Sequence, residues 1–221
     1  MTHPPLIFEE RAAEGEPEGL LVLHHGRGAD EHDLLALADV LDPDRRLHVV
    51  SPRAPLTPPG SSGYHWYLVP RVGFPDPATF QQAFESLAEL HDDLWERTGI
   101  GPERTVLGGF SMGAVMSYSL ALPARRPAPA GIMAFSGFMP TVEGWEPDLA
   151  GRGDLRVFIA HGVRDPVISI DFARHAATVL REGGLRVDYH EGQGSHHIDP
   201  SHLEPATAWL SETLPAEPAS T

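Results

Sequence analysis

The sequence predicts an α/β fold in which a mainly parallel sheet is covered by helices on both faces. Short apolar runs alternate with segments of helical spacing along almost all of the 221 residues. That alternation is typical of parallel strands joined by crossover helices. The length fits one domain, and no internal repeat, linker or lid-sized insertion interrupts the pattern. We therefore predict a single domain over residues 1–214, without a separate lid domain, and a disordered tail over residues 215–221.

The predicted strands are short runs rich in Leu, Val and Ile, as expected where a strand is buried on both faces. A short edge strand is expected near residues 6–9. The buried strands are expected at residues 20–24, 47–50, 104–108, 130–135, 155–160 and 185–190.

The predicted helices carry apolar residues at helical spacing. The longest covers residues 77–98 and is followed by Gly99 and Gly101-Pro102, which are helix stop signals. Asp30 is the expected N-cap of a helix over residues 31–41. The remaining helices are expected at residues 114–122, 171–180 and 203–214.

Residues 53–76 form a long segment rich in proline, glycine and aromatic residues. A loop of this length inside a compact domain is uncommon and is usually functional. The alternative is an ordered connector that its aromatic side chains attach to the surface, and the sequence leaves both interpretations open.

Composition limits the possible functions. The formal net charge of −15 disfavours nucleic acid and anionic membranes as partners. The absence of cysteine excludes disulfides, thiolate metal sites and a cysteine nucleophile. Neither a transmembrane run nor a secretory signal is recognisable, so we expect a cytoplasmic protein without stable membrane association. The oligomeric state cannot be predicted.

The central motif is Gly109-x-Ser111-x-Gly113, which follows a predicted strand and precedes a predicted helix. This is the pattern of a nucleophile elbow, in which a sharp turn presents a serine hydroxyl. The alternative is a glycine-rich turn with a capping serine, and the motif by itself does not decide between them.

Four predicted loops leave the carboxyl ends of strands, where ligands bind in open parallel sheets. They cover residues 25–28, 109–113, 161–166 and 192–198. The last three supply Ser111, Asp165 and His196, in the chain order of a Ser-Asp-His hydrolase.

Alternatives exist for each of these residues. His197 adjoins His196, Ser136 also follows a strand but lacks the first glycine of an elbow, and Asp171 stands near Asp165 at a predicted helix start. His24, His25 and His161 lie near the site, where packing or hydrogen bonding within the loops is their expected role.

Acyl transfer gives each group a role. A serine hydroxyl needs a base to take its proton, and His196 is assigned that task. Asp165 would hold the other ring N–H and stabilise the imidazolium. The backbone N–H of Met112, together with one from the first glycine-rich loop, at Arg27, would bind the oxyanion.

With these motifs in hand, the chain resembles the phospholipase/carboxylesterase family of α/β-hydrolases, which includes the acyl-protein thioesterases. The resemblance rests on residues 23–34, 108–113, 135–137, 161–167 and 194–198. It implies an α/β-hydrolase fold and a compact, cofactor-free serine esterase. It also implies that His196 rather than His197 is catalytic, and that the N–H groups of Arg27 and Met112 form the oxyanion hole.

The expected substrate is a small ester. Aromatic residues and the lack of a lid indicate an open pocket for short or medium acyl chains, lined by Trp66, Tyr67, Phe74 and Phe138. No metal-ligand spacing is present, and no metal or cofactor is expected. Thioester or lysophospholipid hydrolysis on the same triad, and a non-catalytic binding protein on this fold, are the alternatives.

Overall fold

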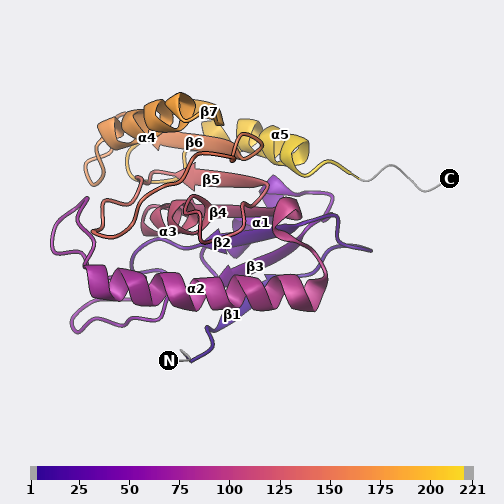
Figure 1. The fold of residues 1–221 in the computed structure, drawn as a ribbon, viewed down its shortest axis with the longest axis horizontal. Coiled ribbons are helices and arrows are strands. Elements are labelled where there is room, and N and C mark those ends of the chain that lie inside the picture. The colour runs from indigo at the N-terminus through magenta and orange to yellow at the C-terminus, as the bar shows by residue number, and fades with distance from the viewer. Residues whose placement is uncertain (1–3, 217–221) are drawn as a thin grey trace.

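The structure, a computed structural model, describes residues 4–216, and one seven-stranded sheet forms its centre (Figure 1). The strand order is β1-β3-β2-β4-β5-β6-β7. β1 is antiparallel to β3, and every other neighbouring pair is parallel. The strands are β1 Phe8–Arg11, β2 Leu20–His24, β3 His48–Pro52, β4 Thr105–Phe110, β5 Gly131–Phe135, β6 Arg156–Gly162 and β7 Arg186–Gly192.

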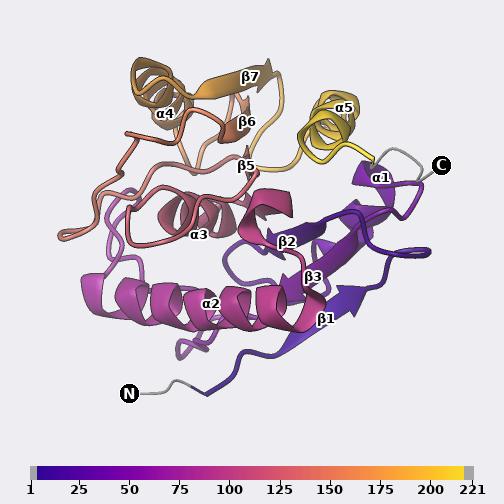
Figure 2. The same ribbon diagram turned by 45° about the vertical axis from the view of Figure 1, so that its right-hand side comes forward.

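Helices cover both faces of the sheet, so the predicted mainly parallel α/β fold is confirmed. Figure 2 shows α2, α3 and α4 on one side and α1 and α5 on the other. The helices are α1 Leu35–Leu41, α2 Pro77–Thr98, α3 Met112–Ala121, α4 Ile170–Glu182 and α5 Leu203–Thr213. Two short 3₁₀ helices, Pro102–Arg104 and Pro200–His202, were not expected from the sequence.

Each central strand contributes side chains to two hydrophobic cores, because successive side chains point to opposite faces. In β5, Ile132 and Ala134 pack with α2, α3 and α4. Met133 and Phe135 pack with α1 and α5. The continuous apolar runs in the sequence therefore reflect burial on both sides, as predicted.

Several predicted boundaries differ from the structure, among them two in the N-terminal part. The edge strand begins at Phe8 rather than at residue 6. The first helix begins at Leu35 rather than at residue 31, and Asp30 does not cap it. The Asp30 carboxylate instead accepts the His32 N–H (2.9 Å) within a turn. Residues 31–34 form turns before the helix, and the buried Glu31 side chain pairs with Arg53.

Segment 53–76 is an ordered connector attached at several points to the end of β2. Backbone bridges join Tyr64 to Ala29, and His65 to Leu56 within the segment. The Trp66 indole N–H donates to the His25 carbonyl (2.9 Å). Of the predicted tail, residues 217–221 lie outside the described residues.

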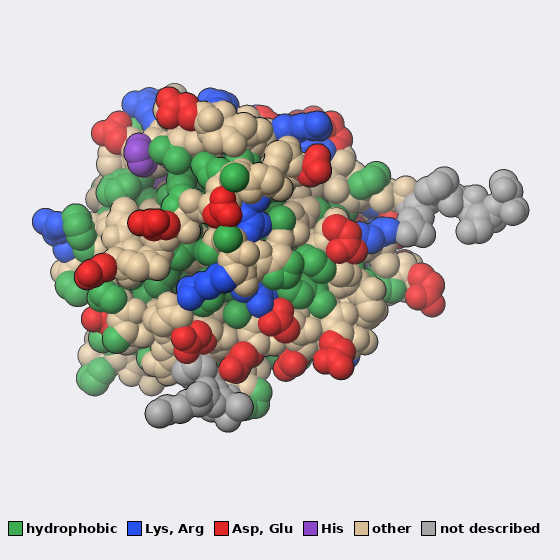
Figure 3. Space-filling view, viewed as in Figure 1, with side chains coloured by type: hydrophobic (Ala, Val, Ile, Leu, Met, Phe, Trp, Pro, Cys, Tyr) green, Lys and Arg blue, Asp and Glu red, His purple; other side chains and the backbone are tan. Residues whose placement is uncertain are grey.

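Acidic side chains are spread over the surface, including a row along α2 (Figure 3). The exposed acids of α2 are Glu85, Glu89, Asp92, Asp93 and Glu96. These are five of the 31 acidic residues of the chain, so the negative charge is distributed over many elements.

Candidate active site

Ser111 lies at the sharp turn between β4 and α3. Its backbone has φ 54° and ψ −117°, a positive-φ conformation that costs a residue with a side chain about 1–3 kcal/mol. Hydrogen bonds hold this conformation from both sides. The Ser111 N–H donates to the Phe135 carbonyl (2.8 Å), and the Ser111 carbonyl accepts the Val115 N–H (3.3 Å). The neighbouring strand and helix thus fix the serine at the carboxyl end of β4.

The two glycines of the motif occupy places where a side chain has no room. A Cβ at Gly113 would lie 1.9 Å from the His24 carbonyl oxygen. A Cβ at Gly109 would lie 2.5 Å from the Gly113 carbonyl carbon. Both distances are far inside van der Waals contact, so the close approach of β2, β4 and α3 requires glycine at these positions.

His196 and Asp165 form a chain of hydrogen bonds with Ser111. His196 Nε2 lies 2.9 Å from Ser111 Oγ, and His196 Nδ1 lies 2.7 Å from Asp165 Oδ2. Asp165 follows β6 and His196 follows β7, so the three side chains meet at the carboxyl ends of parallel strands. The structure brings together the three residues that the sequence singled out.

The alternative residues lie elsewhere. The exposed His197 ring packs beside Gly194. Asp171 is exposed at the start of α4, where it faces Arg174 (3.7 Å). Ser136 is buried after β5 and has a positive φ of 50°. Within residues 4–216, none of these side chains forms a hydrogen bond with the Ser111 hydroxyl.

The Asp165 side chain is fully buried and still favours the charged form. Its Oδ1 accepts the N–H groups of Val167 (2.8 Å) and Ile168 (2.9 Å). Burial alone would raise the pKa of this carboxyl, but the hydrogen bonds from His196, Ile168 and Val167 outweigh it, so the pKa lies below its ordinary value. A carboxylate held in this state can orient His196 and stabilise its protonated ring.

Two backbone N–H groups near Ser111 are available to an anion. Across the described chain, the N–H groups of Arg27 and Met112 form no hydrogen bond. Met112 is the first residue of α3, where helix N–H groups have no partner within the helix. Arg27, Met112 and Ser111 line the same pocket. This arrangement is suited to a negative oxygen that forms beside the serine.

The pocket beside Ser111 has a volume of about 60 Å³ and mainly apolar walls. Tyr67 and Phe138, both named in the sequence analysis, lie on its wall. Residues that the sequence did not single out complete it, namely Val69, Val72, Gly73, Pro75, Val167 and Ile168. Most of them come from loops, where no periodic pattern marks the side chains that face a cavity.

Two predicted pocket residues, Trp66 and Phe74, do not line it, so both predictions are wrong. Trp66 is fully buried, and its indole N–H is used by the His25 carbonyl. Phe74 is 51% exposed and lies under the Arg71 guanidinium (3.6 Å to the ring centre). The sequence placed aromatic residues in the correct segment but could not tell which of them turn toward Ser111.

The histidines behind the elbow form hydrogen bonds that join elements. His25 Nδ1–H donates to the Gly26 carbonyl (2.7 Å), and His25 Nε2 accepts the Ala54 N–H (3.0 Å). His24 Nδ1 bonds Ser117 Oγ (2.9 Å), and His24 Nε2 lies 3.4 Å from His91 Nε2. These contacts connect β2 to segment 53–76, to α3 and to α2.

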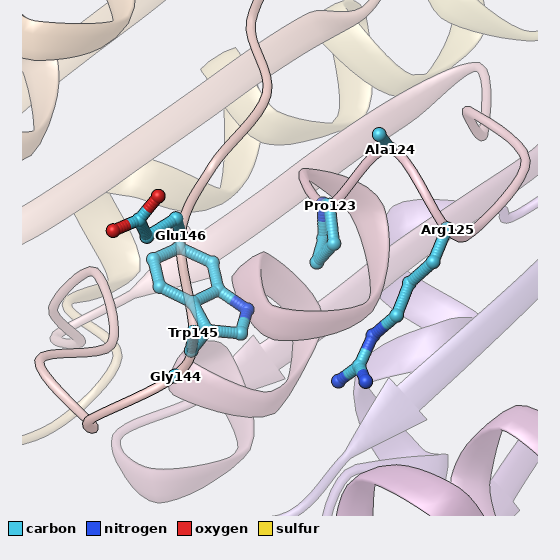
Figure 4. A pocket seen from close by; sticks show the side chains of 6 residues that line it. All are labelled: Pro123, Ala124, Arg125, Gly144, Trp145 and Glu146. Atoms are coloured by element: carbon cyan, nitrogen blue, oxygen red, sulfur yellow. The ribbon is translucent and has the colours of Figure 1, made fainter.

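A second hollow, of about 290 Å³, lies at the C-terminal end of α3 and is lined by residues 123–125 and 144–146 (Figure 4). Ser111 is at the other end of this ten-residue helix, about 15 Å away by helix rise. The Trp145 indole N–H donates to the Ser119 carbonyl (3.2 Å). Figure 4 shows Glu146 and Arg125 on opposite sides of the hollow. Its lining holds no serine or histidine, so the smaller pocket is the candidate active site.

One group of possible metal ligands occurs among residues 4–216, formed by Glu9, Glu31 and His32. The Arg53 guanidinium pairs with Glu31 and lowers the pKa of that carboxyl to about 2. An ion pair therefore accounts for this cluster, and it supports no metal site. No helix in the described part of the chain is long and apolar enough to cross a membrane.

Comparison with known proteins identifies the family of the chain. The family model described as phospholipase/carboxylesterase matches residues 8–214. MhqD of Bacillus subtilis is 27% identical over 90% of this chain and 96% of its own length. Acyl-protein thioesterase 1 of Debaryomyces hansenii is also 27% identical, over 76% of this chain and 77% of its own.

Solved structures of related hydrolases support the same fold and family. The crystal structure of esterase PE8 is 31% identical with a TM-score of 0.79, covering 95% of this chain and all of that one. The Bacillus cereus carboxylesterase superposes with a TM-score of 0.81 at 24% identity, over 94% of both chains, and supports the fold. The chain has the α/β-hydrolase fold and belongs to the phospholipase/carboxylesterase family of hydrolases.

Proposed function

We propose that the chain hydrolyses carboxylic esters of short acyl chains through an acyl-enzyme formed on Ser111. The observation that carries the proposal is the pair of hydrogen bonds at His196, 2.9 Å to Ser111 Oγ and 2.7 Å to Asp165 Oδ2. Family membership supports the reaction class.

In the first step, Ser111 Oγ attacks the ester carbonyl carbon while His196 Nε2 takes the hydroxyl proton. The carbonyl oxygen becomes negative, and the N–H groups of Arg27 and Met112 are positioned to stabilise it. One such donor contributes about 100- to 1000-fold in rate. His196 then returns the proton to the leaving alcohol as the carbon–oxygen bond breaks, and the acyl group stays on Ser111.

Water completes the cycle. His196 takes a proton from a water molecule as the water oxygen attacks the carbonyl carbon of the acyl-enzyme. The N–H groups of Arg27 and Met112 again stabilise the negative oxygen that forms. Collapse of the second tetrahedral intermediate releases the carboxylic acid, and His196 gives its proton back to Ser111 Oγ. Throughout, the Asp165 carboxylate stabilises the ring when it is charged.

The size of the pocket supports short acyl groups. Its volume of about 60 Å³ is less than half of the roughly 150 Å³ that holds a benzene molecule in an engineered protein cavity. Apolar walls favour a hydrocarbon chain, and the limited volume favours a chain of few carbons. We therefore expect acetate to butyrate esters to be better substrates than long-chain esters.

Thioester hydrolysis is the second candidate, because several relatives are named acyl-protein thioesterases. The same attack and the same oxyanion donors would serve a thioester, with sulfur as the leaving atom. Matched oxygen and sulfur esters of one short acyl group would give the preference directly.

Covalent labelling tests the proposal. A fluorophosphonate probe should attach to the peptide that contains Ser111, because the probe reacts with an activated serine hydroxyl. The Ser111→Ala variant should not be labelled, whereas the Ser136→Ala variant, which removes another buried serine at a strand end, should be labelled normally. Label on a different peptide would contradict the assignment.

Turnover provides the second readout. Ser111→Ala should reduce hydrolysis of p-nitrophenyl acetate on the order of a million-fold, as in other serine triads. A wild-type protein that is correctly folded and hydrolyses no ester or thioester would favour a non-catalytic binding protein on this fold.

A further inference from the structure

We propose that His161 is a positioning residue for Asp165: its Nε2–H, which donates to the Ile168 carbonyl, also lies against Asp165 Oδ2, and this contact keeps the carboxylate turned toward His196. The inference rests on the proposed function, because it assigns a further role within the same triad. The carboxylate is then shared between two histidines, one that takes part in proton transfer and one that does not.

The geometry places the His161 ring directly behind the triad. His161 Nε2 lies 2.9 Å from the Ile168 carbonyl oxygen and 3.3 Å from Asp165 Oδ2. The side chains of His161 and Asp165 are both 0% exposed, so water does not compete for these atoms. His161 belongs to β6, which ends one residue later, so its ring is attached to a rigid element.

The neighbouring atoms fix the protonation of this ring. A carbonyl oxygen can only accept, so His161 Nε2 must carry the hydrogen. Burial lowers the pKa of His161, so the second ring nitrogen is unprotonated at neutral pH. Consistent with this tautomer, His161 Nδ1 is buried and has no hydrogen-bond partner in residues 4–216.

With this donor in place, each oxygen of Asp165 faces two donors. Oδ1 accepts the N–H groups of Val167 and Ile168. Oδ2 faces His196 Nδ1 at 2.7 Å and His161 Nε2 at 3.3 Å. A carboxylate has about four acceptor positions, so rotation away from His196 would break several contacts at once. The preferred orientation is therefore the one that serves the triad.

His161 also links the acid to the substrate pocket. Ile168, whose carbonyl accepts the His161 Nε2–H, lines the pocket beside Ser111. Its N–H donates to Asp165. One ring thus fixes the turn that supplies both the acid and part of the pocket wall.

Two substitutions test the proposal. His161→Leu removes the donor and keeps an apolar side chain, and we expect kcat for p-nitrophenyl acetate to fall about 10- to 100-fold, more than KM rises. When Asp165 is no longer held toward His196, it stabilises the protonated ring less. The acid limb of the kcat/KM profile should therefore move to lower pH by about half a pH unit. His161→Gln supplies an amide N–H near the Nε2 position and should restore most of both quantities.

His175→Gln, at an exposed position on α4, is the matched control and should leave the rate and the pH profile unchanged. Near-normal kcat in His161→Leu would overturn the proposal. So would a loss of activity with an unmoved pH profile and no recovery in His161→Gln, because that result describes packing alone.

A measurement on the unmodified protein keeps the proposal testable if His161→Leu fails to fold. Nitrogen-15 NMR of the histidine rings should find His161 with its hydrogen on Nε2 at pH 7. A hydrogen on Nδ1 would overturn the proposal, because Nε2 could not donate to Asp165. Undiminished ester hydrolysis by Ser111→Ala would instead refute the proposed function, and the NMR result would still decide the role of His161.

Discussion

Asp165 and Gly113 illustrate how single residues of the site depend on atoms that the sequence does not reveal. Asp165 favours its charged form in a buried position because N–H groups face both of its oxygens. Gly113 is required because the His24 carbonyl lies where a side chain would be. The motif G-x-S-x-G predicted the turn, but the neighbours that impose it come from β2, far away in the sequence.

Replacing the acid with its amide tests its electrostatic role. Asp165→Asn should lower kcat about 10⁴-fold, because an amide that donates toward His196 Nδ1 favours the wrong ring tautomer. Steady-state kinetics with p-nitrophenyl acetate measures this loss, and circular dichroism checks the fold. A decrease of less than tenfold would exclude Asp165 as the triad acid.

Replacing Gly113 tests the close approach at the elbow. Gly113→Ala should destabilise the protein by about 3 kcal/mol or more, or displace the elbow, because the new Cβ would overlap the His24 carbonyl. Thermal unfolding and fluorophosphonate labelling report the two effects. Gly153→Ala is the control, since nothing lies within 4 Å of a Cβ there. Equal stability of the two variants would contradict the packing argument.

At the scale of elements, three separate segments meet at the wall of the pocket beside Ser111. Phe138 follows β5 and packs on Phe172 of α4 (5.3 Å between ring centres). The Phe172 ring lies against Gly73 in segment 53–76, where a Cβ would be 3.1 Å away. The Thr141 hydroxyl donates to the Gly73 carbonyl. These contacts join three segments behind the part of the pocket wall that Gly73 and Phe138 form.

Opening this wall should change the preferred acyl length. Phe172→Ala removes a half-buried ring behind Phe138, and we expect the kcat/KM ratio of octanoate to acetate p-nitrophenyl esters to rise about tenfold. The control is Phe74→Ala, which removes an exposed ring outside the pocket and should leave the ratio unchanged. Identical ratios in wild type and Phe172→Ala would show that another element limits the acyl chain.

The helices and loops differ in how well their bounds could be predicted from the sequence. The bounds of α2 were predicted correctly because Asp76 caps it, Pro77 begins it and Gly99 ends it in a left-handed conformation. The predicted start of α1 was wrong: the Asp30 carboxylate accepts the His32 N–H, and residues 31–34 form turns before the helix begins at Leu35. The side chains facing the pocket from segment 53–76 could not be predicted, since irregular backbone has no repeat that relates a residue to its direction.

Across the whole molecule, buried histidines link the helices to the sheet and make stability sensitive to acid. Ser117 Oγ donates to the Gly113 carbonyl (3.1 Å), so it accepts from His24 Nδ1–H, and His24 Nε2 accepts from His91 Nε2–H. Burial is the largest cause that lowers the pKa of both histidines, to about 3 for His91. The network is therefore stable only while both rings are neutral.

This network predicts loss of stability in acid. The unfolded chain binds more protons than the folded one below the ordinary histidine value of 6.5, so the free energy of unfolding should decrease as the pH falls from about 6.5 toward 3. Each such histidine contributes up to about 1.4 kcal/mol per pH unit. Urea unfolding at pH 7, 6 and 5 measures the slope.

A variant assigns part of this slope to one ring. His91→Gln keeps a donor toward His24 but cannot be protonated, so its stability should fall less steeply with decreasing pH. His175→Gln, on the exposed face of α4, should retain the wild-type slope. An unchanged slope in His91→Gln would mean that other groups cause the acid sensitivity.

The Thr141–Gly73 hydrogen bond has a consequence for how this enzyme could acquire new substrates. It joins two loops beside the pocket, whereas Ser111, Asp165 and His196 closely follow the ends of β4, β6 and β7. Changes in loop length or sequence can therefore reshape the acyl site while the reacting atoms keep their places. Exchanging these loops between relatives while keeping the hydrogen bond between Thr141 and Gly73 is a direct route to altered substrate selectivity. The three reacting residues would stay unchanged.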